Sequence, residues 1–433
     1  MRNNIQISVV GLWHLGSVTA CCLAEKGFKV NAYDHDETII NNFNIGVLPI
    51  FEPGLEDLIC INKKKGTLSF SSDPFSISNS ELIWVTFDTP VNDQDIADVE
   101  FVINNLITLF PYFKQDSIVL VSSQLPVGSI SYLEKLFLNK FPNRNVSFAC
   151  SPENLRLGKA IDVFMNPDRI IVGIRNGETK TKLNNVLSTV TDNIIWMKVE
   201  SAEMTKHALN AFLATSVVFI NEIAVLCEHV GASANEVEQG LKSEVRIGKK
   251  AYLRPGSAFD GGTLARDLKY LVVKEIEHNL SSIFFSSILQ SNESHKSWIV
   301  NKISAEFPSL KDKKIGMLGL TYKPGTNTLR RSTAIEICNL LHNKGAKITA
   351  FDPSISNLPS NLEKIITLES VIEDLIIGKD AIIVATEWPI FKELSTFDFS
   401  RLTKELLIFD ANSFLQNELN IPGIRYVTIG KSK

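Results

Sequence analysis

Polar side chains recur on one face of an otherwise apolar stretch in the middle of the chain. Lys206 and Asn210 have the spacing of neighbours on a helix surface, and Asn221 follows about three turns later on nearly the same face. The stretch is apolar almost all round, which predicts a buried helix. Because buried polar groups cost free energy unless they find partners, this stripe lines either an internal polar contact or a ligand site.

A second group of residues has the spacing of a dinucleotide-binding loop. The segment VVGLWHLGSVTACCLAEKG follows an expected strand and opens an expected helix. Gly11 would make the tight turn, and Gly16 would let the helix pack closely on the sheet. The N–H groups at the start of the helix would then face a pyrophosphate. Asp34 ends the second strand, where an acidic residue accepts from the adenosine ribose.

The loop departs from this pattern at its middle position. Trp13 stands where the pattern has a glycine, which lets the backbone approach the phosphates. Two alternatives follow: an NAD-binding domain, or a Rossmann-like domain that binds no dinucleotide. For the first, the residues predicted to bind the cofactor are Gly11, Trp13, His14, Leu15, Gly16, Asp34 and Thr89.

Glu153 is a third candidate. It follows a Ser-Pro pair at the end of an expected strand, and α/β sheets place their ligands at that edge. The alternative role is that of a helix cap or a first-turn residue.

The elements that must position these residues alternate between strand and helix. Apolar runs at 5–10, 29–33, 82–87, 118–122, 146–149 and 170–174 predict strands, with helices such as 17–26 and 97–110 between them. This alternation predicts a parallel sheet covered on both faces. Helices follow from about residue 200 to 307, and strands return at 314–318, 347–351, 381–385 and 407–409.

Two segments are similar in sequence: KVNAYD, which ends at Asp34, and KITAFD, which ends at Asp352. The sequence therefore predicts an α/β fold with two Rossmann-like, doubly wound domains joined by a central helical domain with one long helix. The predicted boundaries are 1–199 for an NAD-binding domain, 200–308 for a helical dimerisation domain, and 309–433 for a second Rossmann-like domain.

Composition narrows the function classes. The net charge of −4 gives no reason to expect nucleic acid or an anionic membrane as a partner. The 6 cysteines form no C-x-x-C pair and have no metal-ligand spacing, so we expect reduced, mostly buried thiols and no metal. The apolar stretch 211–227 carries Asn221 and Glu222, which a membrane span would resist. We expect a cytoplasmic protein.

Several motifs resemble those of the UDP-glucose/GDP-mannose dehydrogenase family, in order and over nearly the whole chain. They are GVLPIFEPGLEDLI at 46–59, LPVGS at 125–129, SPENLRLGKAIDVFMNPDRIIVG at 151–173, EMTKHALNAFLATSVVFINEIAVLCE at 203–228 and LGLTYKPGTNTLRRS at 318–332. Members of the family oxidise the C6 alcohol of a nucleotide sugar to a carboxylate with two NAD. The resemblance implies a UDP-sugar as substrate, a homodimer and a place in polysaccharide biosynthesis.

The resemblance also implies roles for individual residues. Lys206 and Asn210 would stabilise negative charge on the substrate oxygen, Glu153 would be an acid/base, and Asp267 a base or water-positioning group. Helix capping is the alternative for Asp267. The residues implied to bind the sugar nucleotide are Arg246, Phe259, Gly261, Gly262 and Lys323, and Arg330 is implied to meet cofactor phosphates; solvated surface charge is the alternative for the basic ones.

The departures from the family concern chemistry rather than fold. The glycine pair Gly261–Gly262 is followed by Thr263, Leu264 and Ala265 where the family carries its nucleophilic cysteine, and no cysteine lies between Cys227 and Cys338. Counted from Gly262, the interval to Asp267 is one residue shorter than in the family.

Other family positions are also replaced. A threonine is replaced by Gln124, an acidic pair by Asn327 and Thr328, an arginine by Asn412, and the lysine before the aspartate by Arg266.

The missing thiol affects the two oxidations of the family reaction differently. The first oxidation needs hydride transfer, a base and charge stabilisation, whereas the second passes through a covalent thiohemiacetal. We therefore predict an NAD-dependent oxidoreductase that carries out a two-electron oxidation of a nucleotide sugar. The alternative is a nucleotide-sugar-binding pseudoenzyme.

Overall fold

A computed structural model describes residues 5–92, 97–153, 155–260, 262–399, 402, 404–419 and 421–431. The chain divides into two compact units, Met1–Leu209 and Asn210–Lys433. The second unit holds most of the helical middle together with the second sheet, and the three domain boundaries above stay a prediction.

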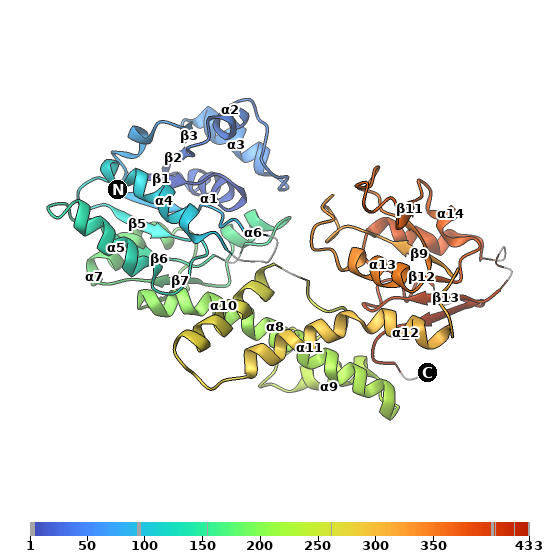
Figure 1. Cartoon of the computed structure of the whole chain (residues 1–433). Helices are drawn as coiled ribbons and strands as arrows, with labels where there is room; N and C mark the ends of the chain where they lie inside the picture. Colours follow the sequence, from blue (N-terminus) through green and yellow to red (C-terminus); the bar gives the residue numbers. More distant parts are fainter. Residues whose placement is uncertain are drawn as a thin grey trace. The chain divides into compact units, whose positions relative to one another are not determined.

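The N-terminal unit contains an eight-stranded sheet in the order β3-β2-β1-β4-β5-β6-β7-β8 (Figure 1). Its strands are β1 (Gln6–Val10), β2 (Lys29–Tyr33), β3 (Leu68–Ser71), β4 (Leu82–Val85), β5 (Ile118–Val121), β6 (Ser147–Cys150), β7 (Ile170–Gly173) and β8 (Ile194–Met197). The prediction of a parallel sheet is confirmed from β3 to β6 and is wrong at one joint. There β6 meets β7 in the antiparallel sense, through the single pair Cys150 and Gly173. Alternation of strands and helices does not encode direction for so short a pairing.

Helices cover this sheet. They are α1 (His14–Glu25), α2 (Glu37–Asn44), α3 (Leu55–Lys65), α4 (Val99–Leu109), α5 (Ser129–Lys140), α6 (Ala160–Met165) and α7 (Gly177–Leu187). The helix expected from Ser17 begins three residues earlier, because Trp13 is extended and His14 already has helical backbone.

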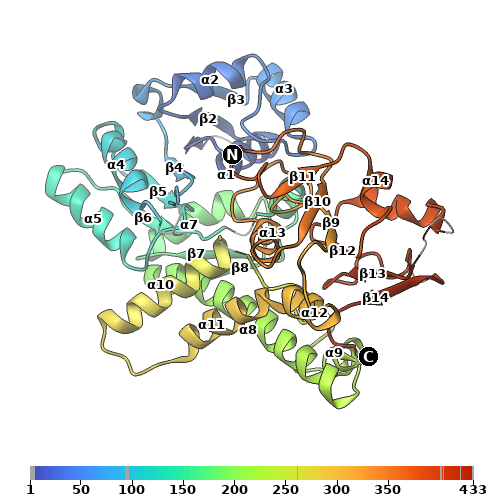
Figure 2. The same ribbon diagram turned by 45° about the vertical axis from the view of Figure 1, so that its right-hand side comes forward.

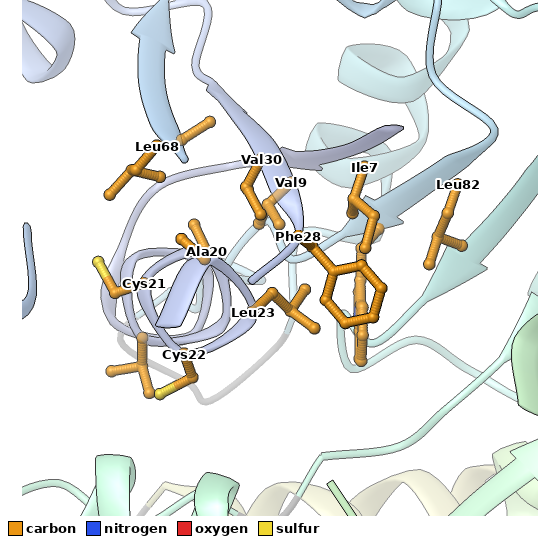
Figure 3. Packing of buried hydrophobic residues seen from close by; sticks show 14 of the residues in the cluster. Ile7, Val9, Ala20, Cys21, Cys22, Leu23, Phe28, Val30, Leu68 and Leu82 are labelled. Carbon is orange, nitrogen blue, oxygen red and sulfur yellow. The ribbon is translucent and has the colours of Figure 1, made fainter. Parts of the chain in front are cut away.

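Figure 3 shows how α1 packs on the sheet. Ala20 and Leu23 of α1 lie among Val9, Val30 and Phe28, and all five side chains are buried. This apolar contact fixes the helix, and with it the loop that leads into the helix, because apolar burial contributes about 25 cal/mol per Å².

The cysteines behave as small apolar residues. Cys21 and Cys22 lie in the same cluster, and burial raises the pKa of both thiols, that of Cys22 to about 12. All six cysteines are unpaired, and Cys60 alone is exposed, which confirms the expectation that the thiols are mostly buried.

The predicted long helix is α8 (Val199–Val230). By length and composition it could cross a membrane, as can the core helix of a soluble protein, and 44% of its most apolar window is buried. Its part in the C-terminal unit packs Ala211, Ala214 and Val218 against Leu268 and Ile288. The helices that follow it are α9 (Ala234–Ser243), α10 (Thr263–Glu277), α11 (Phe284–Lys296) and α12 (Trp298–Glu306).

The second sheet has six parallel strands in the order β11-β10-β9-β12-β13-β14 (Figure 2). They are β9 (Lys314–Leu318), β10 (Lys347–Phe351), β11 (Ile366–Leu368), β12 (Ala381–Val384), β13 (Leu406–Phe409) and β14 (Ile424–Val427), with α13 (Thr333–Asn343) and α14 (Ile372–Ile376) between them. This order repeats that of the first six strands of the N-terminal sheet, so the prediction of two Rossmann-like sheets is confirmed.

The repeat extends to single hydrogen bonds. The Asp34 carboxylate accepts from the Leu12 N–H at 2.7 Å, and the Asp352 carboxylate accepts from the Leu320 N–H at 2.8 Å. In each sheet the residue that ends the second strand therefore holds the turn that follows the first strand.

Candidate active site

The turn after β1 has the geometry of a nucleotide-binding loop. Gly11 has φ +92, which favours glycine, and a Cβ at this position would lie 2.6 Å from Phe87. A Cβ on Gly16 would lie 1.8 Å from the Gly11 carbonyl oxygen. Both glycines are therefore required, and the roles predicted for them in the turn and in close packing are supported by this geometry.

The start of α1 suits an anion. Trp13 is the N-cap residue and its side chain makes no capping hydrogen bond, so the first N–H groups of the helix have no side-chain acceptor there. Asp34 is buried beside the same turn and accepts from the N–H groups of Leu12 and Asp36. Helix terminus, turn and acidic residue together fit the pyrophosphate and ribose of NAD.

Trp13 is not part of the hydrophobic core that packs around α1. Its side chain is 44% exposed at the mouth of this loop. The ring therefore lies partly in solvent, beside the turn that is expected to hold the cofactor phosphates.

His14 and Glu52 form a pair beside the loop. The His14 Nε2 lies 2.8 Å from the Glu52 carboxylate, which also accepts from the N–H groups of Gly158 and Ala160 at 2.8 Å. Burial raises the pKa of Glu52, but these hydrogen bonds outweigh it, so the pKa lies below its ordinary value. Glu52 was not among the predicted site residues; its only sequence signal was its place in the PIFEPGL motif.

The end of β4 is tied to the turn after β5. The buried Thr89 hydroxyl donates to the Gln124 carbonyl oxygen at 2.8 Å. Glu203 of α8 accepts from the N–H groups of Gly128 and Ile130 at the start of α5. These bonds fix the LPVGS turn at the carboxyl edge of the sheet, where a Rossmann-like domain binds its ligand.

Glu153 and Lys206 meet at that edge. The Lys206 ammonium donates to the Glu153 carbonyl oxygen at 2.7 Å and lies 4.0 Å from its carboxylate. Glu153 precedes α6 by seven residues, and its carboxylate accepts from the Leu155 N–H. The alternative role of capping that helix is therefore wrong, and an ammonium and a carboxylate stand together at the ligand edge.

Asn210 and Asp267 form the corresponding pair in the C-terminal unit. Both side chains are buried, and the Asn210 amide donates to the Asp267 carboxylate. Asp267 lies in the second turn of α10, whose N-cap is Gly262, so it is not a helix cap. A carboxylate held by an amide in a dry setting can act as a base.

The C-terminal unit also contains a cavity of about 500 Å³. Loop residues 251–260 form one wall, and Tyr322, Lys323 and Thr333 of the second sheet domain line another. Among the residues that line it, Lys242, Arg254 and Lys323 are basic, and Asp260 and Glu387 are acidic. The volume lies within the range of sites for small molecules.

Side-chain amides hold the cavity loop by its backbone. Asn221 accepts from the Gly256 N–H at 2.9 Å, and Asn292 bonds both the N–H and the carbonyl of Phe259. Asn412 accepts from the Ser257 N–H at 2.7 Å. The polar residues on one face of α8 were expected to line either an internal polar contact or a ligand site. At Asn221 the structure shows an internal polar contact, which shapes a cavity wall.

The predicted substrate residues fall into three groups. Phe259 and Lys323 line the cavity, and Gly262 lies near it, since a Cβ there would be 3.5 Å from the Tyr322 hydroxyl. Arg246 is exposed, pairs with Glu244 at 3.0 Å and is not among the lining residues. Gly261 lies outside the described residues.

Two further assignments concern cofactor and metal. Arg330 is exposed in the loop between β9 and α13 of the C-terminal unit, and its cofactor role stays a prediction. Within the described ranges, no group of three or more His, Cys, Asp or Glu residues could hold a metal ion.

Comparison with known proteins agrees with this architecture. Residues 5–191, 200–294 and 316–417 match the NAD binding domain, the central domain and the UDP binding domain of the UDP-glucose/GDP-mannose dehydrogenase family. The chain is 32% identical over 433 residues to UDP-glucose 6-dehydrogenase of Rickettsia conorii, covering 98% of this chain and 99% of that one. It is also 32% identical to UDP-glucose 6-dehydrogenase TuaD of Bacillus subtilis, covering 98% and 93%.

Solved structures give the same result. A UDP-glucose dehydrogenase from Pyrobaculum islandicum superposes with a TM-score of 0.84 at 25% identity, covering 98% of this chain and 96% of that one. A UDP-D-ManNAc dehydrogenase from Pyrococcus horikoshii, at 21% identity and a TM-score of 0.82 with 99% of both chains covered, shares the fold. With its NAD-binding, central and UDP-binding domains in order, the chain belongs to the UDP-glucose/GDP-mannose dehydrogenase family.

Proposed function

We propose that the chain is an NAD-dependent oxidoreductase of the UDP-glucose 6-dehydrogenase type, and that it oxidises the alcohol of a UDP-sugar once, to the aldehyde. The observation that carries this proposal is the buried pair of Asn210 and Asp267. A protein that only binds its ligand does not need a buried carboxylate oriented by a side-chain amide, whereas an enzyme can use it as a base. By resemblance to the family, we also propose that this enzyme acts in the cytoplasm, in polysaccharide biosynthesis.

The chain's own groups can manage the proton and the charge. The turn at Gly11 and the Asp34 carboxylate would hold NAD, which would supply the acceptor for the hydride of the alcohol carbon. Asp267 or Glu153 takes the hydroxyl proton, so that one hydride and one proton leave the substrate together. An amide carries two N–H donors, so Asn210 can bond Asp267 with one and the substrate oxygen with the other. By resemblance to the family, we also propose that the Lys206 ammonium stabilises negative charge on the substrate.

A second oxidation of the family kind lacks its nucleophile. Thr263 is the first residue of α10, and Leu264 packs partly buried in an apolar cluster beside Phe259. Neither can form a thiohemiacetal, and the described residues of this segment offer no thiol.

The cavity of the C-terminal unit is the proposed site for the nucleotide. It is lined by residues of the regions that match the family's central and UDP binding domains, and Arg254 and Lys323 supply positive charge for a diphosphate. Arg254 is held in place by its bond to the Asn412 carbonyl oxygen at 2.6 Å. It therefore stands next to the position where the family arginine is replaced.

The alternative, a pseudoenzyme that binds a nucleotide sugar, is favoured by Trp13 at the mouth of the loop. One experiment separates the two functions. The protein is mixed with NAD and a panel of UDP-sugars, and NADH absorbance is followed. Sugar-dependent NADH formation supports the enzyme, whereas UDP-sugar binding by calorimetry without any NADH supports the pseudoenzyme.

We also propose a homodimer formed through α8. Phe212, Phe219 and Leu226 are exposed at seven-residue intervals on this helix, followed by Val230. Such spacing produces an apolar seam that a second helix can cover. Light scattering after gel filtration should give a dimer mass, and Phe219→Glu should convert it to the monomer mass.

A further inference from the structure

Asp260 is an acidic residue in an unexpected place. It directly precedes the glycine pair, lines the cavity of the C-terminal unit and is half-buried. Within the part of the chain that the structure describes, the hydrogen-bond donor to its carboxylate is Thr333, the first residue of α13. A carboxylate in a ligand cavity acts on whatever the cavity binds.

The neighbourhood of Asp260 has an excess of negative charge. Lys296, a cation that stabilises the Asp260 charge, pairs with Glu293 at 3.1 Å and with Glu336 at 3.2 Å. Asp260 and these two carboxylates thus share one ammonium group. Burial raises the pKa of Asp260 to about 6, opposed by the Thr333 hydrogen bond and by Lys296, so the group is charged at neutral pH.

Positive charge lies elsewhere on the cavity wall. Arg254 and Lys323 line it, whereas Lys242 is engaged by Glu238 at 2.5 Å. A ligand that suits this cavity should place its phosphates against the two available cations. The part of the ligand near Asp260 should carry hydrogen-bond donors, and positive charge most favourably, because a partly buried charge is stabilised by a counter-ion.

We propose that Asp260 is a specificity-determining residue that selects a nucleotide sugar with a free amino group. The proposal rests on the proposed function, which puts a nucleotide sugar in this cavity. The ammonium group of the sugar would meet the Asp260 carboxylate in the cavity, while Arg254 and Lys323 meet the diphosphate. A neutral hydroxyl in the same place would gain a hydrogen bond but would leave the excess charge uncompensated.

A structural role makes a different prediction. Ser332 is the N-cap of α13, but its side chain makes no capping hydrogen bond. The structural alternative is therefore that Asp260 holds the start of that helix and has no part in ligand choice. In that case Thr333→Val, which removes the hydroxyl and keeps the Asp260 charge, should resemble Asp260→Asn in every measurement. If Asp260 reads the substrate, the two variants should share a loss of stability but differ in their choice of ligand.

Calorimetry with UDP, UDP-glucose and UDP-glucosamine at pH 7.5 tests the proposal on the full-length protein. We expect UDP-glucosamine to bind about tenfold more tightly than UDP-glucose. Asp260→Asn should remove this preference without changing the affinity for UDP, and Thr333→Val should keep it. Urea unfolding of each variant shows that the folded protein is being compared.

The pH dependence supplies a second readout. The preference for the amino sugar should be present above pH 6 and fade as the pH drops through about 6, because protonation removes the charge of Asp260. Equal binding of both sugars, or a preference that Asp260→Asn retains, would overturn the inference while leaving the proposed function intact. Failure to bind UDP itself would instead overturn the proposed function.

Discussion

The Asn210 amide donates to the Asp267 carboxylate, and both groups are buried between α8 and α10. The bond joins two residues that are 57 positions apart in the chain. It fixes the orientation of a carboxylate that would otherwise be costly to bury, and it leaves one amide hydrogen for another acceptor.

The first prediction follows from this pair. Asp267→Asn should lower kcat at least about 100-fold, because the base is lost while the shape is kept. Asn210→Ala should lower kcat as well and should also lower the free energy of unfolding by about 1–3 kcal/mol, since the carboxylate loses a buried partner. Steady-state kinetics and urea unfolding measure the two effects.

Asn221→Ala is the matched control, because it also removes a buried amide from α8. The Asn221→Ala substitution removes the hydrogen bond that holds the cavity loop at Gly256, whereas the Asn210–Asp267 bond stays in place. It should destabilise the protein to a similar extent and raise KM with a smaller effect on kcat. If Asp267→Asn keeps full activity, Asp267 is not the base.

The second prediction concerns the cofactor. Asp34 should select NAD over NADP, because a 2′-phosphate beside this buried carboxylate would be repelled. Fluorescence titration with both cofactors measures the preference, and tighter binding of NADP would contradict the assignment.

Trp13→Gly separates two roles of the exposed ring. Because the ring is not packed in the core, the substitution should cost little stability. NAD binding should stay equal or become tighter if the ring merely obstructs the loop. A large loss of affinity would show that the ring is part of the site, and Trp13→Phe should then restore much of the binding.

Local patterns predicted the parts of the site that lie close together in sequence. The turn at Gly11, the close packing at Gly16 and the acidic end of β2 follow from residue spacing within one β-α-β unit. The repeat of this unit at Asp352 followed from the same pattern.

Long-range features were not accessible in this way. Glu52 bonds Gly158 and Ala160 more than 100 residues away, and Asn412 bonds Ser257 across 155 residues. No periodicity relates such positions, since tertiary packing alone brings them together. The antiparallel joint of β6 and β7 escaped prediction for the same reason.

The third prediction concerns the nucleotide. Lys323→Ala should weaken UDP binding by about 1.5–3 kcal/mol, the contribution of a charge-assisted hydrogen bond. Isothermal titration calorimetry measures the affinity, and the exposed Lys364→Ala, which does not line the cavity, is the control. An unchanged affinity in Lys323→Ala would remove that residue from the phosphate site.

The Asn412 position bears on the same affinity. Without the family arginine, UDP should bind more weakly than is usual for the family, by a similar amount. Asn412→Arg should not simply restore the contact. The Asn412 side chain accepts from the Ser257 N–H and lies against Gly256, where a Cβ would be 2.4 Å from its oxygen. The longer side chain would therefore displace the cavity loop, and we expect a weaker rather than a tighter complex.

The last prediction concerns the missing thiol. The product should be the aldehyde, with one NADH formed per sugar. The proposed mechanism supplies groups for the first hydride transfer only, and the described residues near Gly262 offer no thiol to hold the carbonyl covalently. Leu264→Cys should not recover acid formation, since Leu264 packs in an apolar cluster and a nucleophile misplaced by about an ångström loses much of its rate. Thr263→Cys is the informative comparison, because Thr263 is exposed at the N-terminal end of α10, a position that favours a thiolate. Mass spectrometry of the product, together with the number of NADH formed per sugar, distinguishes one oxidation from two. A uronic acid made by the unmodified protein at two NADH per sugar would contradict the prediction. It would show that the protein oxidises the aldehyde hydrate directly and that the absent cysteine does not limit the reaction.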